Sequence, residues 1–149
     1  MSADNRQKAY EEVNILIVDD DDVTVMGIRR AITRMKLLNP VRVAKDGVEA
    51  LDILRGAAGV ERLLPPYIIL LDLNMPRMDG HEFLEHVRAD PMLHNAVIFV
   101  LTTSDAPDDV TKAYGRNVAG YIVKDDLYDT FNRMLELVER YSRLIVLPN

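Results

Sequence analysis

The sequence predicts an α/β fold in which parallel strands alternate with helices. Short apolar runs of strand length alternate along the chain with segments in which apolar residues recur at helical spacing. Four of the apolar runs stop directly before a polar or charged residue, namely Asp19, Asp72, Thr102 and Lys124. The carboxyl ends of parallel strands meet at one edge of a sheet, where open α/β folds bind their ligands. We therefore expect these residues to lie together at that edge.

Five apolar runs are predicted as the strands. Each has strand length, and a helical segment separates each run from the next, which favours parallel pairing. Their ranges are 14–18, 41–44, 67–71, 97–101 and 120–123.

The helices are predicted from apolar residues at helical spacing and from the residues that begin or end them. The first helix ends before Pro40 and the third ends at Asp90, while the fourth has Pro107 and acids in its first turn, at the positive end of the helix dipole. The apolar residues of the first helix are Val25, Ile28, Ile32 and Met35; the second spans 48–54; the third carries Phe83, Leu84 and Val87; the last spans about 127–140 with Leu127, Phe131, Met134, Leu135 and Val138.

This alternation of five strands and five helices predicts a flavodoxin-like doubly wound sheet in the order 2-1-3-4-5. The segment 55–66, with its glycines and prolines, is a loop of unusual length for a compact domain. We expect an N-terminal tail at 1–12, a single domain at 13–141 and a C-terminal extension at 142–149.

Composition excludes several classes of function. The formal net charge of −6, from 24 acidic and 18 basic residues, argues against binding to nucleic acid or to anionic lipid. The chain has no cysteine for a disulfide, a thiol nucleophile or a zinc-thiolate site. The first dozen residues contain no apolar signal segment, and no apolar run reaches the length of a membrane span. We therefore expect a soluble, cytoplasmic protein.

The strand-end residues have the chemistry needed for phosphoryl transfer. A carboxylate such as that of Asp72 is a competent nucleophile and forms an acyl phosphate. Attack on a negatively charged phosphoryl group requires a hard cation, and Mg²⁺ binds carboxylate and phosphate oxygens. Lys124 can neutralise phosphoryl oxygens, and the Thr102 hydroxyl can donate a hydrogen bond to one of them.

Taken singly, most of these residues also have an ordinary structural explanation. Asp21 and Asp22 are expected to cap the following helix, and Thr102 alone would be a strand-end hydroxyl. An acid such as Asp72 at the end of an apolar strand is costly unless it lies at an open edge with a partner. Polar residues at four successive strand ends favour one common site. The histidines, His81, His86 and His94, lack metal-ligand spacing and are expected to be solvated.

These residues and their spacing resemble the receiver domain of two-component response regulators over residues 13–140. The matching motifs are Asp19-Asp20, Asp72 within the segment 71–80, Thr102, and Tyr121 to Lys124. Within that family the chain is most similar to the single-domain regulators of cyanobacterial and bacterial phytochrome kinases. The finer likeness lies in the long loop before Tyr67, the segment 101–104 and the extension 144–148.

The resemblance implies a role for each residue of the site. Asp72 would accept a phosphoryl group from a sensor histidine kinase with Mg²⁺ bound. Asp20 and Asp72 would be direct carboxylate ligands, Asn74 would offer its backbone carbonyl, and Asp19 would bind directly or through water. Thr102 and Tyr121 would form the switch, and the output would be a change in protein binding, with no separate catalytic domain.

One departure from the family pattern leaves alternatives open. Most receivers carry a proline in a cis peptide after the lysine, whereas Lys124 is followed by Asp125. This peptide is therefore either trans and differently routed or a strained cis bond, which costs about 2.5 to 4 kcal/mol. A pseudo-receiver that binds partners without phosphorylation is therefore the alternative function. A haloacid-dehalogenase-type phosphatase is disfavoured, because Asn74 stands where that class needs a second acid.

The apolar extension at 144–147 also permits two arrangements. It either folds back over its own domain, near the loop 55–66, or reaches across to a second copy. In the second case the faces of the last two helices would form a two-fold homodimer interface, as the resemblance implies.

Overall fold

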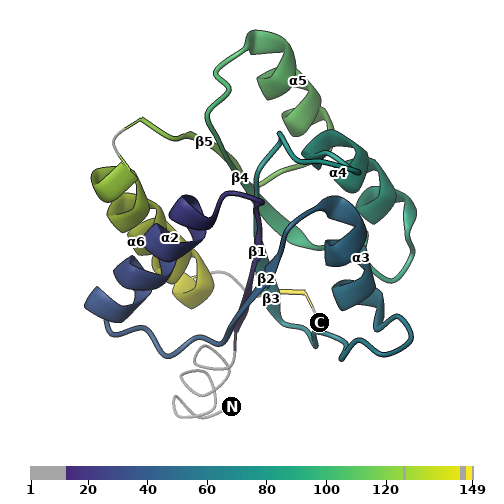
Figure 1. Cartoon of the computed structure of the whole chain (residues 1–149), viewed down its shortest axis with the longest axis horizontal. Helices are drawn as coiled ribbons and strands as arrows, with labels where there is room; N and C mark the ends of the chain where they lie inside the picture. Colours follow the sequence, from purple (N-terminus) through teal and green to yellow (C-terminus); the bar gives the residue numbers. More distant parts are fainter. Residues whose placement is uncertain (1–12, 126, 145–146, 149) are drawn as a thin grey trace.

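The computed structural model describes residues 13–125, 127–144 and 147–148. In this part of the chain five parallel strands form one sheet in the order β2-β1-β3-β4-β5, with helices on both faces (Figure 1). The strands are β1 (Asn14–Val18), β2 (Val41–Ala44), β3 (Tyr67–Leu71), β4 (Val97–Thr102) and β5 (Gly120–Val123). The helices are α2 (Asp22–Arg34), α3 (Gly47–Arg55), α4 (Gly80–Ala89), α5 (Pro107–Gly115) and α6 (Leu127–Leu144). The predicted flavodoxin-like fold is confirmed.

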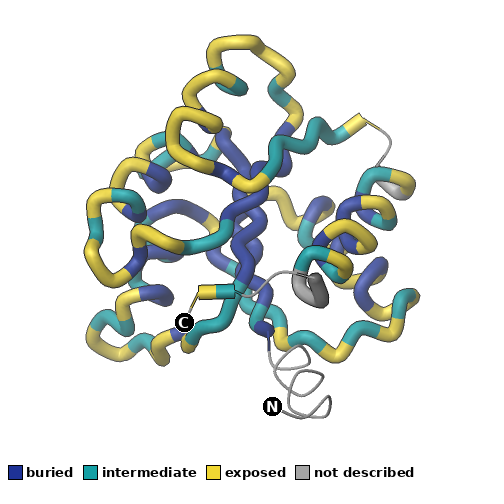
Figure 2. Tube along the Cα trace, turned by 180° about the vertical axis from the view of Figure 1, so that it is seen from behind, coloured by how far each residue is buried: buried dark blue, intermediate teal, exposed yellow. Residues whose placement is uncertain are grey.

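Both faces of the sheet are buried, which explains why its strands are apolar throughout instead of alternating. In β1, Ile15 and Ile17 face the layer of α2 and α6, whereas Leu16 and Val18 face the layer of α3, α4 and α5. Figure 2 shows the same division, with a buried sheet between helices whose outer sides are exposed. The core is therefore two apolar clusters separated by the sheet.

Most helix boundaries agree with the prediction, and two do not. Asp21 is the N-cap of α2, and its side chain accepts a hydrogen bond from the Val23 N–H. The prediction that Asp22 also caps this helix is wrong, because Asp22 is the first helical residue and its side chain is exposed. Helix α6 continues to Leu144 instead of ending near Arg140.

The long loop between α3 and β3 is held against the domain. Gly56 ends α3 with a left-handed φ of 66°, a conformation that costs little only for glycine. Arg42 Nη1 then donates to the Glu61 carbonyl at 2.6 Å, and the buried Leu63 bonds through its N–H to Ile53 O at 2.9 Å. These contacts give the segment a defined path, which its composition alone did not predict.

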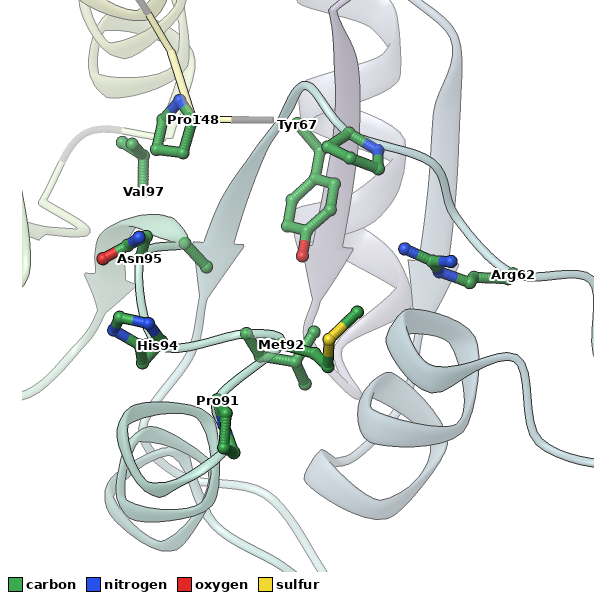
Figure 3. A pocket seen from close by; sticks show the side chains of 11 residues that line it. Arg62, Tyr67, Pro91, Met92, His94, Asn95, Val97 and Pro148 are labelled. Carbon is green, nitrogen blue, oxygen red and sulfur yellow. The ribbon is translucent and has the colours of Figure 1, made fainter.

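The described residues of the C-terminal extension lie on their own domain. Leu147 packs against the cluster beneath α2 and α6. Pro148 lines a pocket of about 240 Å³ at the amino ends of β3 and β4, together with Tyr67, Val97 and Met92 (Figure 3). This placement agrees with the folded-back arrangement for these two residues. Residues 1–12 and the positions 145–146 and 149, on which the other expectations fall, lie outside the described part of the chain.

No helix in the described part of the chain is both long and apolar enough to cross a membrane.

Candidate functional site

The carboxyl edge of the sheet brings the predicted site residues together. Strands β1, β3, β4 and β5 run in register, with Val18 beside Leu71 and Thr102 beside Val123, so the residues at or just after their ends share one edge. One carboxylate oxygen from each of Asp19, Asp20 and Asp72 lies within 4.8 Å of the others. Such a group of oxygen ligands is chemically suited to Mg²⁺.

Lys124 lies against this carboxylate cluster. Its Nζ is 2.9 Å from Asp19 Oδ2, and the two side chains are only 5% and 3% exposed. The same ammonium donates to Thr24 Oγ1 at 3.3 Å, and the Lys124 N–H bonds to Thr102 O at 2.8 Å. The lysine is thus held at both its backbone and its charged end.

The peptide after Lys124 resolves one open alternative. Among the described residues the one cis peptide joins Pro65 to Pro66, so the bond from Lys124 to Asp125 is trans. Lys124 nevertheless reaches Asp19, which means that the missing proline does not prevent the lysine from entering the site.

Burial makes the charged forms of two carboxylates costly. Desolvation raises the pKa of Asp72 above its ordinary value of 3.8, and the Lys124 charge and hydrogen bonds from Asn74 and Thr102 only partly oppose it. Desolvation likewise raises the pKa of Asp19, against the hydrogen bond that its Oδ1 accepts from the Asp21 N–H. A positive charge bound beside these groups would favour their ionised forms.

The loop after Asp72 approaches the strand end closely. The Asn74 N–H lies 3.4 Å from Asp72 Oδ1, and Asn74 itself is exposed. At the end of the loop, a β-carbon at Gly80 would collide with the Asp72 carbonyl oxygen, so only glycine fits there. Farther from the site, Arg77 forms a two-pronged ion pair with Asp46, the N-cap of α3. The segment is therefore tied to both neighbouring elements.

The two predicted switch residues are linked through a third. Thr102 is fully buried, and the Ser104 N–H lies 3.4 Å from its Oγ1. The Tyr121 hydroxyl donates to the carbonyl of the same Ser104 at 2.8 Å. Ser104 therefore connects Thr102 to Tyr121 in this structure.

The structure also shows site contacts that sequence reasoning missed. Thr24 contacts both Lys124 and Asp21, and a threonine on the third residue of a helix carries no sequence signal for that role. The expectation that His81 is solvated is wrong: its side chain is 22% exposed and its Nε2 lies 2.9 Å from Asp109 Oδ1. This contact joins residues 28 positions apart, because the first turns of α4 and α5 face one another. His86 and His94 are exposed, as expected.

A comparison with protein-family models finds a match that covers most of the chain. The response regulator receiver domain matches residues 15–136 of this chain.

Individual proteins and structures agree with that match. The probable methanogenesis regulatory protein FilR2 of Methanothrix harundinacea is 36% identical over 90% of this chain and 86% of its own length. The response regulator Rcp1 of Synechocystis sp. is 30% identical over 90% of this chain and 92% of its own, and the structure of its Mn²⁺-bound form superimposes with a TM-score of 0.79 over 92% and 99% of the two chains. The phosphorylated cyanobacterial phytochrome response regulator RcpA is 31% identical, with a TM-score of 0.83 over 93% of this chain and 99% of its own.

Proposed function

Because the chain belongs to the family of response regulator receiver domains, we propose that it accepts a phosphoryl group on Asp72 from a sensor histidine kinase and thereby switches its protein contacts. The observation that carries this proposal is the grouping of Asp72, two further carboxylates and the Lys124 ammonium at one sheet edge. A site built for structure alone would not gather several costly charges around a buried carboxylate.

In the proposed transfer, a carboxylate oxygen of Asp72 attacks the phosphorus of a phosphohistidine. The bond from phosphorus to the imidazole nitrogen breaks, the imidazole takes the electron pair, and an acyl phosphate remains on Asp72. Lys124 would neutralise a phosphoryl oxygen, and the Thr102 hydroxyl would donate to another. The chain is thus a phosphoacceptor that promotes its own phosphorylation and dephosphorylation.

The same edge is suited to a divalent cation. Asp19, Asp20 and Asp72 would hold Mg²⁺, with the backbone carbonyl of Asn74 as a further ligand. A bound Mg²⁺ would supply Lewis-acid neutralisation of the charge between carboxylate and phosphoryl group. The Mn²⁺-bound form of the similar protein Rcp1 supports this assignment.

The likeness to phytochrome response regulators suggests the partner. We propose a bacterial phytochrome as the kinase and the cytoplasm as the place of the reaction, in keeping with the similarity to RcpA. The homodimer through α5 and α6 stays a prediction. Tyr114 on α5 and Leu137 on α6 are about half exposed and would be available for it.

Phosphorylation itself is the direct test. Incubation with acetyl phosphate and Mg²⁺ should label the protein with one base-labile phosphoryl group, and Asp72→Asn should abolish the label while the circular dichroism spectrum stays unchanged. Asp20→Ala should weaken Mg²⁺ binding by calorimetry at least about tenfold, since it removes a ligand. Asp22→Ala is the matched control, because Asp22 is an adjacent but exposed first residue of α2.

Three outcomes would contradict the assignment. An Asp72→Asn variant that is labelled at the wild-type rate would show that Asp72 is not the acceptor. Equal losses of Mg²⁺ affinity in Asp20→Ala and Asp22→Ala would show that the acidic residues attract the ion only through their combined charge. A wild-type protein that never traps beryllofluoride in the presence of Mg²⁺ would instead support the pseudo-receiver.

A further inference from the structure

One buried residue of α2 breaks the apolar pattern of its helix. The buried residues of α2 are Thr24, Ile28, Ala31 and Ile32, and Thr24 is the one polar member of this set. Its side chain belongs to a residue that is 1% exposed, whereas the adjacent Val23 is 63% exposed. A helix held by apolar burial alone would carry an apolar residue at the buried position. A buried hydroxyl is costly without hydrogen bonds, so the contacts of Thr24 must explain its place.

The Thr24 hydroxyl connects the N-cap of α2 to the lysine of the site. Lys124 Nζ donates to Thr24 Oγ1 at 3.3 Å and to Asp19 Oδ2 at 2.9 Å. The Thr24 hydroxyl donates to Asp21 Oδ2 at 2.9 Å, and the Asp21 N–H donates to Asp19 Oδ1 at 2.9 Å. These four residues form a closed ring of hydrogen bonds, which we call the lysine anchor.

The chemistry of the groups fixes the direction of each bond in the lysine anchor. An ammonium can only donate and a carboxylate can only accept, so the Thr24 hydroxyl must accept from Lys124 and donate to Asp21. Among the described residues, two of the three N–H groups of Lys124 are used in this way, by Asp19 and Thr24. Two fixed bonds set the orientation of a tetrahedral ammonium, and one N–H remains for a further acceptor.

We propose that Thr24 is a positioning residue, which holds the Lys124 ammonium so that its remaining N–H can bind an oxygen of the phosphoryl group on Asp72. This inference rests on the proposed function and adds a residue to the same site. One oxygen of Asp72 lies within 4.8 Å of an oxygen of Asp19, to which the ammonium is bonded. The hydroxyl of Thr24 bonds to Lys124 and Asp21, so its effect on Asp72 must pass through the lysine.

Asp19 alone would be a poor anchor for the lysine once a cation is bound. Asp19 is one of the carboxylates proposed to hold Mg²⁺, and a divalent cation there would repel the ammonium. Thr24 is neutral and lies outside the group of three carboxylates, so it remains an acceptor for the lysine. A phosphoryl oxygen needs only one N–H, so both bonds of the ammonium can persist beside it. Removing the Thr24 hydroxyl should therefore weaken the binding of a phosphoryl group.

The first test observes the Lys124 ammonium itself, without Mg²⁺ or beryllofluoride. The ammonium protons of an exposed lysine exchange with water too fast to be observed, whereas burial and hydrogen bonds slow the exchange. Lys36, Lys45 and Lys112 are exposed, whereas the Lys124 side chain is 5% exposed. NMR of protein labelled with ¹⁵N-lysine should therefore show a protected ammonium resonance from Lys124, which Lys124→Arg removes.

Three variants decide whether Thr24 holds this ammonium. Thr24→Val removes the hydroxyl at nearly constant volume, and the protons of Lys124 should then exchange at least about fivefold faster. Thr24→Ser keeps the hydroxyl and should stay within about twofold of the wild type. Asp22→Ala is the matched control, because it removes an exposed acid of the same turn that is not part of the lysine anchor. If Thr24 served only the helix cap, Thr24→Val would lower the unfolding temperature and leave the exchange unchanged.

The second test measures the affinity for beryllofluoride with saturating Mg²⁺ by ¹⁹F NMR. Thr24→Val should bind this phosphoryl mimic about three- to tenfold more weakly than the wild type, which corresponds to one hydrogen bond to a charged group. Thr24→Ser and Asp22→Ala should both stay within about twofold. Recovery by serine shows that the hydroxyl, and not the shape of the side chain, is responsible.

Each contrary result overturns a different step. A wild-type protein without a protected Lys124 resonance, or unchanged exchange in Thr24→Val, would overturn the lysine anchor. Equally fast exchange in Thr24→Ser or Asp22→Ala would assign the change to a general loosening of α2. Faster exchange in Thr24→Val with unchanged or tighter binding of the mimic would overturn the effect on Asp72. Failure of the wild type to bind beryllofluoride would overturn the proposed function, while the ammonium resonance would still decide whether Thr24 holds Lys124.

Discussion

The two faces of the sheet are covered in different ways. On one face α2 and α6 pack directly, and a β-carbon at Gly27 would collide with the ring of Phe131, which is 2% exposed. On the other face α5 buries only Ala113 among its residues, and its contacts with α4 include the hydrogen bond between His81 and Asp109 and those of Arg88 at its carboxyl end. Figure 2 shows the same contrast, with much of the α5 region exposed.

The difference separates two tasks of the site. Thr24, which contacts Lys124, belongs to the closely packed helix α2, so the lysine beside the carboxylate cluster is supported from the firmer face. Ser104 lies in the loop after β4 and bonds to Asp109 of α5, the helix that buries only Ala113. Close packing resists movement, whereas a few hydrogen bonds can exchange between two arrangements. We infer that the closely packed helix α2 and the more loosely held helix α5 lie on opposite faces of one sheet.

The difference in packing between the two faces is tested most strongly by removing a large side chain from between α2 and α6. Phe131→Ala should lower the free energy of unfolding by about 3 to 5 kcal/mol, because it removes a fully buried aromatic side chain. Leu137→Ala, on the same helix at a position that is 47% exposed, should change it by at most about 0.5 kcal/mol. Urea denaturation of both variants measures the difference. A loss below about 1 kcal/mol for Phe131→Ala would mean that α2 and α6 are not closely packed.

A smaller substitution sharpens the same contrast. Gly27→Ala should destabilise the domain by about 1 to 2 kcal/mol, since the steric cost against Phe131 exceeds the better helix propensity of alanine. Gly115→Ala, at the end of α5, meets no atom within 4 Å and should stabilise by at most about 1 kcal/mol. A lower unfolding temperature for Gly27→Ala and a higher one for Gly115→Ala would support the difference in packing. A stabilising Gly27→Ala would contradict it.

The smallest expected effect is a change in the pH dependence of stability, through Asp72 at the carboxyl edge of the sheet. The pKa of Asp72 is raised in the folded state by burial, so the folded protein binds this proton more tightly than the unfolded chain does. Without Mg²⁺, the stability of the wild type should therefore fall as the pH rises from 3.8 through the raised pKa.

Asp72→Asn should remove this contribution and be the more stable protein at neutral pH. The dependence of stability on pH should be weaker in this variant but should not vanish, because the pKa of Asp19 is raised by burial as well. Chemical denaturation at several pH values measures it, and added Mg²⁺ should stabilise the wild type more than the variant. A variant that is less stable at neutral pH without Mg²⁺ would show that the Asp72 charge is favourable in the fold.

The sheet and the strand-end residues could be predicted because both depend on local sequence. An apolar run such as 67–71 specifies a buried strand, and parallel pairing brings Asp72 to the edge that Asp19 and Thr102 share. The roles proposed for these residues remain to be tested, but their proximity required only the order of the elements. The cap at Asp21 depended on a single backbone conformation, which separates it from Asp22.

The contacts that could not be predicted depend on how helices are placed against one another. His81 reaches Asp109 only because α4 and α5 lie side by side in a particular orientation, and no periodicity in either helix encodes that angle. The partners of Ser104 likewise come from β4, α5 and β5. Local patterns specify elements, whereas such networks follow from their packing.

Arg88 has a consequence for how freely this surface can vary. Its guanidinium donates to four backbone carbonyls and, among the residues that the structure describes, to no side chain. Those carbonyls belong to His94, Ala96, Arg116 and Asn117. Every residue type offers the same carbonyl, so the anchor constrains the length and path of the two connections and leaves most side chains open to replacement. Asn117 is the exception, since its φ of 61° favours asparagine or glycine. The surface beside α4 and α5 can therefore diverge to suit new partners while the scaffold beneath it keeps its shape.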